Sequence, residues 1–154
     1  MQAIIFCGIQ ASGKTSFYRE RYFDTHVRIS LDVLHTRRRE LLILAACIEG
    51  RQPFVVDNTN PTVAERARYL APALAAGFEA IGYFFATEPG AAFERNRRRP
   101  GRAAVPAAGL SATYKRLQIP TREEGFHRLY RVGLTAVGDF HVSESHAAAE
   151  LVNG

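Results

Sequence analysis

The sequence is poor in cysteine, in lysine and in long apolar runs, and these shortages exclude several classes of protein. Its two cysteines, Cys7 and Cys47, lie 40 positions apart in apolar surroundings, which suits neither a disulfide framework nor a metal-ligand spacing. The longest strictly apolar run, residues 41–48, has eight residues, whereas a membrane span needs about 20. No charged and apolar leader opens the chain. We therefore expect a cytoplasmic protein with no membrane partner, and no obligate protein partner is evident.

The length and composition fit one globular domain. The chain has 154 residues, of which 47% are hydrophobic and 23% are charged. A single hydrophobic core typically holds about 100–200 residues. Disordered, collagen-like and coiled-coil proteins have other compositions. We expect a single domain that spans residues 1–154.

The positive charge is concentrated in one segment. Lysine is scarce, since 18 of the 20 basic residues are arginine, and a G+C-rich genome would produce such an excess without any functional cause. The net charge is +5. However, residues 95–122 hold seven arginines and one lysine with no carboxylate, a charge of +8. The rest of the chain has 12 basic and 15 acidic residues, a charge of −3. A polyanionic partner is therefore expected at this segment.

Short apolar runs alternate with stretches of helical periodicity. Alternating strands and helices are typical of an α/β protein, with a parallel sheet covered by helices on both faces. We expect strands at residues 3–7, 27–30, 54–57, 78–85, about 129–134 and about 139–142. We expect helices at residues 14–22, 32–49, 62–76, 91–98 and 105–117.

Residues 8–15 have the pattern G-x-x-x-x-G-K-[ST], between an expected strand and an expected helix. The glycines let the backbone turn its N–H groups toward phosphate oxygens, and the helix N-terminus adds partial positive charge. Lys14 is expected to reach the β- and γ-phosphates of a nucleoside triphosphate, and Thr15 to hold Mg²⁺. The alternative is a glycine turn that matches by chance. The residues expected to bind the nucleotide are Gly8, Gln10, Ala11, Ser12, Gly13, Lys14, Thr15 and Ser16.

Two aspartates follow expected strands, where the carboxyl ends of parallel strands meet beside the P-loop. Asp32 would accept the proton of an attacking hydroxyl, as a kinase requires, or it would cap the following helix. Asp57 would orient Mg²⁺, or it would belong to a polar turn over residues 57–61. Thr15 and Asp57 are therefore the expected metal residues.

An arginine-rich segment begins at Arg95. Phosphoryl transfer is catalysed largely by positioning and by cations that neutralise charge on the transferred group. A lid over residues 95–106 would supply such cations and exclude water. The alternatives are a solvated basic turn and a nucleic-acid patch without a catalytic part.

These features resemble the kinase domain of polynucleotide 5′-hydroxyl kinases, most closely that of the bifunctional kinase/3′-phosphatase DNA-repair enzymes. The likeness runs from Ile4 to about Val132. It is carried by Cys7-Gly8, residues 57–61 and 66–69, Arg95-Asn96, Val105-Pro106, residues 114–116 and 120–121, and residues 123–126.

The resemblance implies ATP and Mg²⁺ as cofactors, a nucleic-acid 5′ end as substrate, and a role for several residues. Asp32 matches the general base, and Lys14 and Thr15 match the phosphate and magnesium residues. Arg99 matches the essential lid arginine, with Arg98 beside it, and Arg95 matches a lid arginine near the nucleotide. The implied catalytic residues are Asp32, Lys14 and Arg99; the implied acceptor-side residues are Asp32, His35, Arg38, Asn58 and Asn60.

The sequence departs from the family pattern on the acceptor side. Ser30-Leu31 precedes the expected base, where the family commonly has Asn-Arg, and Gln10-Ala11 replaces a Pro-Gly or Pro-Ala pair in the phosphate loop. His35 stands where a phage relative has an arginine, with arginines at 37–39 close behind. No D-x-D-G-T motif occurs in these 154 residues, so we expect no 3′-phosphatase half among them.

Three functions therefore remain. The first is an ATP-dependent kinase acting on the 5′-hydroxyl of a polynucleotide. The second is a kinase of the same fold acting on a small metabolite or nucleoside. The third is a non-kinase NTPase or a nucleotide-binding regulator, against which Asp32 weighs.

Overall fold

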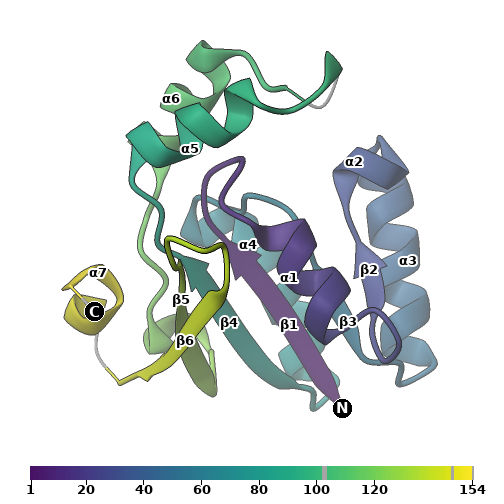
Figure 1. The fold of residues 1–154 in the computed structure, drawn as a ribbon. Coiled ribbons are helices and arrows are strands. Elements are labelled where there is room, and N and C mark those ends of the chain that lie inside the picture. Colours follow the sequence, from purple (N-terminus) through teal and green to yellow (C-terminus); the bar gives the residue numbers. More distant parts are fainter. Residues whose placement is uncertain (102–103, 147, 154) are drawn as a thin grey trace.

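The computed structural model describes residues 1–101, 104–146 and 148–153. Strands and helices alternate as the sequence predicts (Figure 1). In chain order the elements are β1 (Gln2–Cys7), α1 (Lys14–Arg21), β2 (Val27–Ile29), α2 (Leu31–Leu34), α3 (Arg37–Glu49), β3 (Phe54–Val56), α4 (Val63–Ala75), β4 (Glu79–Phe85), α5 (Pro89–Arg97), α6 (Ala107–Arg116), the 3₁₀ turn η2 (Arg122–Glu124), β5 (Arg128–Leu134), β6 (Phe140–Ser145) and α7 (Ala148–Asn153).

The strands form one six-stranded sheet in the order β2-β3-β1-β4-β5-β6. The chain builds β2 and β3 on one side of β1 and then crosses to build β4 and β5 on the other. Such a reversal is a topological switch point, and ligands of open α/β sheets bind outside the carboxyl ends of the strands there. The loop that follows β1 lies at this end of the sheet.

Helices cover both faces of the sheet, as predicted. On one face α1 packs Phe17 and Tyr18 against Phe6 and Phe85. The other face is covered by α3, α4 and α7. The core strand β1 is buried along residues 3–7, because both of its faces are covered. The expected doubly covered α/β sheet is thus confirmed.

Some details of the expected pattern are wrong. The sixth strand runs antiparallel to β5, since a short turn joins the two strands and such a connection cannot produce a parallel pair. The helix expected over residues 32–49 is two helices. His35 has a left-handed φ of 65°, and Thr36 caps α3 by accepting from the Arg39 backbone N–H. Helix α7 was not predicted.

None of the helices in the described ranges has the length and apolar character that crossing a lipid bilayer requires.

Candidate nucleotide and acceptor site

The P-loop over residues 8–15 connects β1 to α1, as the motif predicts. A Cβ atom on Gly8 would lie 2.9 Å from the Cβ of Phe85, closer than such atoms approach in proteins. Gly13 has a φ of 95° and is the N-cap of α1. Both glycines are therefore required by the backbone itself, and the loop leads directly into a helix N-terminus.

Lys14 is buried inside this loop. Its Nζ donates to the carbonyls of Gly8 at 2.9 Å and Ile9 at 2.6 Å, and to the hydroxyl of Ser12 at 3.1 Å. An ammonium group has three donors, and these three bonds use all of them. A phosphate that accepts from Lys14 therefore has to replace at least one of these acceptors. Burial lowers the pKa of Lys14 to about 8, although the nearby carboxylate of Asp57 opposes the shift.

Charges on two other elements also act on the Lys14 ammonium. After burial and Asp57, the causes of its lowered pKa include the charge of Arg99, which lowers it further, and that of Asp32, which opposes the shift. The fold thus brings Lys14, Asp32, Asp57 and Arg99 close enough for their charges to interact. These residues come from four separate segments of the sequence.

Thr15 and Asp57 meet as the metal prediction requires. The Thr15 hydroxyl donates to Asp57 Oδ2 at 2.9 Å. Both groups are hard oxygen donors, and Mg²⁺ is commonly held by one or two protein oxygens together with substrate phosphates. The two side chains therefore fit Mg²⁺.

An arginine that was not predicted joins this pair. Arg28 of β2 donates through Nε to Asp57 Oδ2 at 2.8 Å, and its Nη2 lies 2.7 Å from the same oxygen. The same Nη2 donates to Thr15 Oγ1 at 3.2 Å. The sequence does contain a sign of this role, because Arg28 is a charged residue between two apolar residues of an expected strand.

Asp32 lies in the first turn of α2 and is exposed. The N-cap of that helix is Ser30, so the alternative that Asp32 is itself the cap is wrong. A carboxylate in the first turn is still favoured by the helix dipole. His35 and Arg38 are exposed on the segment that follows.

Asn58 connects α2 to the sheet. Its Oδ1 accepts from the backbone N–H of Leu31 at 2.9 Å, and its Nδ2 donates to Glu40 and to the Tyr69 hydroxyl. Glu40 is 1% exposed and also accepts from Arg37 at 2.8 Å. The Asn58 side chain thus bonds to protein groups next to Asp32. The predictions gave no role to Glu40, which occupies an ordinary position in a helical pattern.

Asn60 lies deeper. Its side chain is 3% exposed and donates to the carbonyl of Phe6 at 2.8 Å. Its own carbonyl accepts from Arg66, a fully buried residue of α4. Arg66 forms two parallel bonds with Glu124, at 2.7 and 2.8 Å. The resemblance included both residues of this ion pair without indicating what they do.

Helices α5 and α6 stand at the end of the sheet where the P-loop lies, on the same side as α2 (Figure 1). Both helices are tied to the P-loop. Arg95 Nε donates to the Ala11 carbonyl at 2.7 Å, and Gln10 donates to the Thr113 hydroxyl of α6 at 2.9 Å. In the described part of the chain, Nη2 of Arg95 is buried and has no hydrogen-bond partner. This donor suits an acceptor brought in by a ligand.

Two hydrogen bonds between the Asn96 side chain and the Val105 backbone join the two ends of the expected lid segment, and we call this pair the Asn96–Val105 clasp. Asn96 donates to the Val105 carbonyl at 2.6 Å and accepts from the Val105 N–H at 2.9 Å. Arg98 is 77% exposed and pairs with Glu94, whereas the charge of Arg99 acts on Lys14. Residues 102 and 103, which the lid prediction includes, lie outside the described residues.

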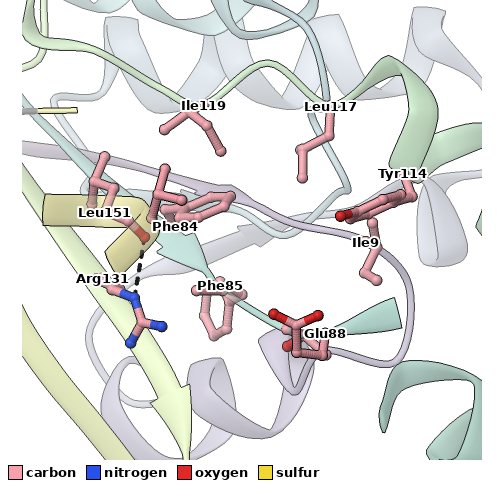
Figure 2. Close-up of a pocket in the computed structure, with 12 residues that line it drawn as sticks. Ile9, Phe84, Phe85, Glu88, Tyr114, Leu117, Ile119, Arg131 and Leu151 are labelled. Carbon is pink, nitrogen blue, oxygen red and sulfur yellow. Dashed lines mark hydrogen bonds between the residues drawn. The ribbon is translucent and has the colours of Figure 1, made fainter. Parts of the chain in front are cut away.

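A separate pocket of about 190 Å³ opens between the end of β4, helix α6, strand β5 and helix α7 (Figure 2). Its walls are mainly apolar, and Arg131 there donates to the Leu151 carbonyl at 3.1 Å. Ile9 is the P-loop residue among its described lining residues, which do not include Lys14, Asp32 or Asp57. The predicted site residues therefore gather elsewhere, at the P-loop.

The chain resembles a curated protein over most of its length. Among curated proteins, the bifunctional polynucleotide phosphatase/kinase of Schizosaccharomyces pombe is 21% identical over 145 residues, which is 90% of this chain and 35% of that protein. The chain thus spans about a third of the length of that relative.

Solved structures show the same fold. A gluconokinase from Sinorhizobium meliloti 1021 aligns with 98% of this chain and 87% of its own, with a TM-score of 0.60 and 21% identity. Chaetomium thermophilum Kti12, in complex with ADP-AlF3, aligns with 85% of this chain and 88% of its own, with a TM-score of 0.63 and 17% identity. The family model described as "AAA domain" matches residues 4–120. Because that match covers most of the chain, the chain belongs to this AAA domain family, and its fold is that of the P-loop kinases.

Proposed function

We propose that the chain is an ATP- and Mg²⁺-dependent kinase, and that its acceptor is the 5′-hydroxyl of a polynucleotide. The observation that carries the kinase proposal is the position of Asp32. It is an exposed carboxylate in the first turn of α2, close enough for its charge to act on the ammonium of Lys14. A kinase needs a base beside the hydroxyl of its acceptor, whereas a protein that only binds nucleotide does not.

In the proposed reaction the acceptor oxygen forms a bond to the γ-phosphorus while the bond from that phosphorus to the ADP oxygen breaks. Asp32 takes the proton of the attacking hydroxyl. Lys14 and Arg99 donate to the phosphate oxygens, and Arg95 places its unpartnered Nη2 toward the nucleotide. Thr15 and Asp57 are the residues that would hold Mg²⁺, which supplies positive charge to the phosphates.

Two observations support a polynucleotide acceptor. The likeness to the polynucleotide phosphatase/kinase extends over 90% of this chain. Part of the segment of residues 95–122, whose charge is +8, forms α5 and α6, and these helices stand at the end of the molecule where the P-loop and α2 lie (Figure 1). We also propose that residues 95–106 act as a lid over the triphosphate, closed at its base by the Asn96–Val105 clasp.

A small-molecule kinase is the second candidate. It is favoured by the alignment with 87% of the gluconokinase chain and by His35, which replaces an arginine of a polynucleotide-kinase relative. The two candidates use the same base and the same nucleotide site and differ in the acceptor alone.

The test is a transfer assay with γ-labelled ATP and Mg²⁺. We expect label on a 5′-hydroxyl oligonucleotide and none on the same oligonucleotide carrying a 5′-phosphate. DNA and RNA oligonucleotides are compared, and gluconate and nucleosides are assayed as small acceptors in parallel. Transfer to a small acceptor alone rejects the polynucleotide, and ATP binding without transfer to any acceptor rejects the kinase proposal.

A further inference from the structure

The guanidinium group of Arg28 lies against both side chains that fit Mg²⁺. It contacts Asp57 Oδ2 through Nε at 2.8 Å and through Nη2 at 2.7 Å, and it donates to Thr15 Oγ1 at 3.2 Å. The Asp57 side chain is 2% exposed and that of Arg28 is 21% exposed. Solvent therefore screens these contacts far less than it screens an ordinary surface ion pair.

The fold holds this arginine in place. Arg28 is the middle residue of β2 and is in register with Val55 of β3. The backbone N–H of Asp57 donates to the carbonyl of the next residue, Ile29, at 2.8 Å. The guanidinium also lies over the ring of Tyr18, 5.8 Å from its centre. Strand pairing and ring contact thus position Arg28, so its place at the two oxygens is a property of the sheet.

A guanidinium group and Mg²⁺ require the same oxygens. The Thr15 hydroxyl has one hydrogen and two lone pairs; the hydrogen goes to Asp57 and one lone pair accepts from Arg28. Mg²⁺ approaches its oxygen ligands to about 2.0–2.1 Å. A divalent cation on Thr15 would therefore lie next to the positive charge of Arg28, and the two would repel each other.

We propose that Arg28 competes with Mg²⁺ for Thr15 and Asp57 and thereby sets the Mg²⁺ concentration that nucleotide binding requires. Arg28 balances the buried charge of Asp57 when that carboxylate has no metal beside it, and it withdraws from Thr15 when Mg²⁺ enters with the nucleotide. This inference rests on the proposed nucleotide site and is independent of the acceptor.

The experiment measures binding without turnover. Mg²⁺ is titrated into protein with a fixed amount of N-methylanthraniloyl-ADP, and the midpoint is read from fluorescence. We expect Arg28→Gln to lower the Mg²⁺ midpoint about threefold or more, since a competing cation is removed. The matched control is Arg21→Gln on α1, which removes one positive charge from a side chain that is 46% exposed and paired with Glu20. Its midpoint should equal that of the wild type.

A midpoint for Arg28→Gln that is equal to or above the wild-type value overturns the proposal, because Arg28 then supports the metal site. Arg28→Lys keeps a positive charge beside Asp57, so its midpoint should stay near that of the wild type. If its midpoint falls as far as that of Arg28→Gln, charge competition is rejected. If the wild-type protein binds no nucleotide at any Mg²⁺ concentration, the proposed function is rejected. The same titration therefore distinguishes failure of the proposed function from failure of the Arg28 proposal.

Arg28→Gln leaves a buried carboxylate without its cation, which can prevent folding. Wild-type protein then decides the question by nitrogen-15 NMR of the Arg28 Nε–H group. We expect that signal to move when Mg²⁺ is added to the protein in the presence of ADP, compared with the same sample before Mg²⁺ is added. An Nε–H signal that stays at the same position overturns the proposal.

Discussion

Lys14 shows how one side chain links the resting loop to ligand binding. Its ammonium holds the P-loop through three internal bonds, and burial lowers its pKa to about 8. Phosphate oxygens favour the charged amine, so a bound nucleotide raises that pKa again. The nucleotide complex therefore binds the Lys14 proton more tightly than the free protein does.

This linkage predicts a pH dependence of nucleotide affinity. Below pH 8 the free protein already carries the proton, and affinity is insensitive to the titration of Lys14. As pH rises above this value the free protein loses the proton, so affinity for ADP should fall, by at most about tenfold per pH unit. Calorimetric titrations between about pH 7 and pH 9 measure this change. Lys14→Met should bind more weakly with no such slope, and an affinity of the wild type that is constant up to pH 9 would contradict the assignment.

Asp32 gives the second prediction at this scale. The Asp32→Asn side chain is isosteric but cannot take a proton at neutral pH, so phosphoryl transfer should fall by about 10²-fold or more. ADP affinity should remain within about twofold, because Asp32 belongs to α2 and not to the P-loop that is proposed to bind the phosphates. Transfer kinetics and calorimetry on the same protein separate the two effects. Loss of ADP binding together with transfer would make Asp32 a structural residue.

At the scale of elements, α2 is held in place by a side-chain hydrogen bond as well as by the packing of Leu34 against the core. None of its four residues, all of which the structure describes, is buried. The N-cap Ser30 makes no side-chain capping bond within the described residues. Asn58, from the end of β3, binds the Leu31 N–H instead and is itself held by Glu40 and Tyr69. We therefore propose that Asn58 is a positioning residue for Asp32.

Asn58→Leu should consequently lower the rate of transfer while leaving nucleotide affinity unchanged. Displacement of a catalytic group by about 1 Å can cost about 10²-fold, and we expect a fall of about tenfold in kcat with an unchanged KM for ATP. The comparison variant is Tyr69→Phe, which removes one partner of Asn58 but keeps its bond to Leu31. Equal effects of the two variants, or a KM effect alone, would show that Asn58 acts through general stability.

At the scale of the whole molecule, one buried ion pair joins segments that are distant in sequence. Arg66 of α4 binds Glu124 of η2 and donates to the carbonyls of Asn60, Pro61 and Gln118. It thereby connects the loop after β3, helix α4 and the chain that leads into β5. We therefore expect the arrangement of the loop after β3 to depend on this connection.

Arg66→Ala should destabilise the protein by about 3–5 kcal/mol, because it leaves Glu124 buried without its cation. Arg68→Ala, an exposed position on the same helix, should change stability by no more than about 0.5 kcal/mol. Urea unfolding followed by circular dichroism compares them. A double variant Arg66→Met with Glu124→Leu should cost less than the sum of the single changes, since the two charges are coupled. Purely additive costs would refute that coupling.

The sequence by itself determined the local features of this protein. The glycine and lysine spacing of residues 8–15 predicts the P-loop, and the alternation of apolar runs with helical periodicity predicts the doubly covered sheet. These features depend on backbone geometry and on residues close in the chain, so they can be read from spacing. The break at His35 was missed because apolar positions continue at helical spacing across it.

Tertiary structure alone decided which arginines the buried carboxylates meet. Arg28 pairs with Asp57 across 29 positions, and Arg66 pairs with Glu124 across 58. Strand order and crossover connections set such neighbours, and no spacing along the chain indicates them. The sequence therefore predicts Thr15, Asp32, Asp57 and Asn58 as site residues, whereas only the fold shows that Arg28 contacts Thr15 and Asp57 and that Asn58 accepts from the Leu31 N–H at the start of α2. The physical reason is that a buried charge or amide must find a partner, and the partner is whichever group the sheet brings within reach.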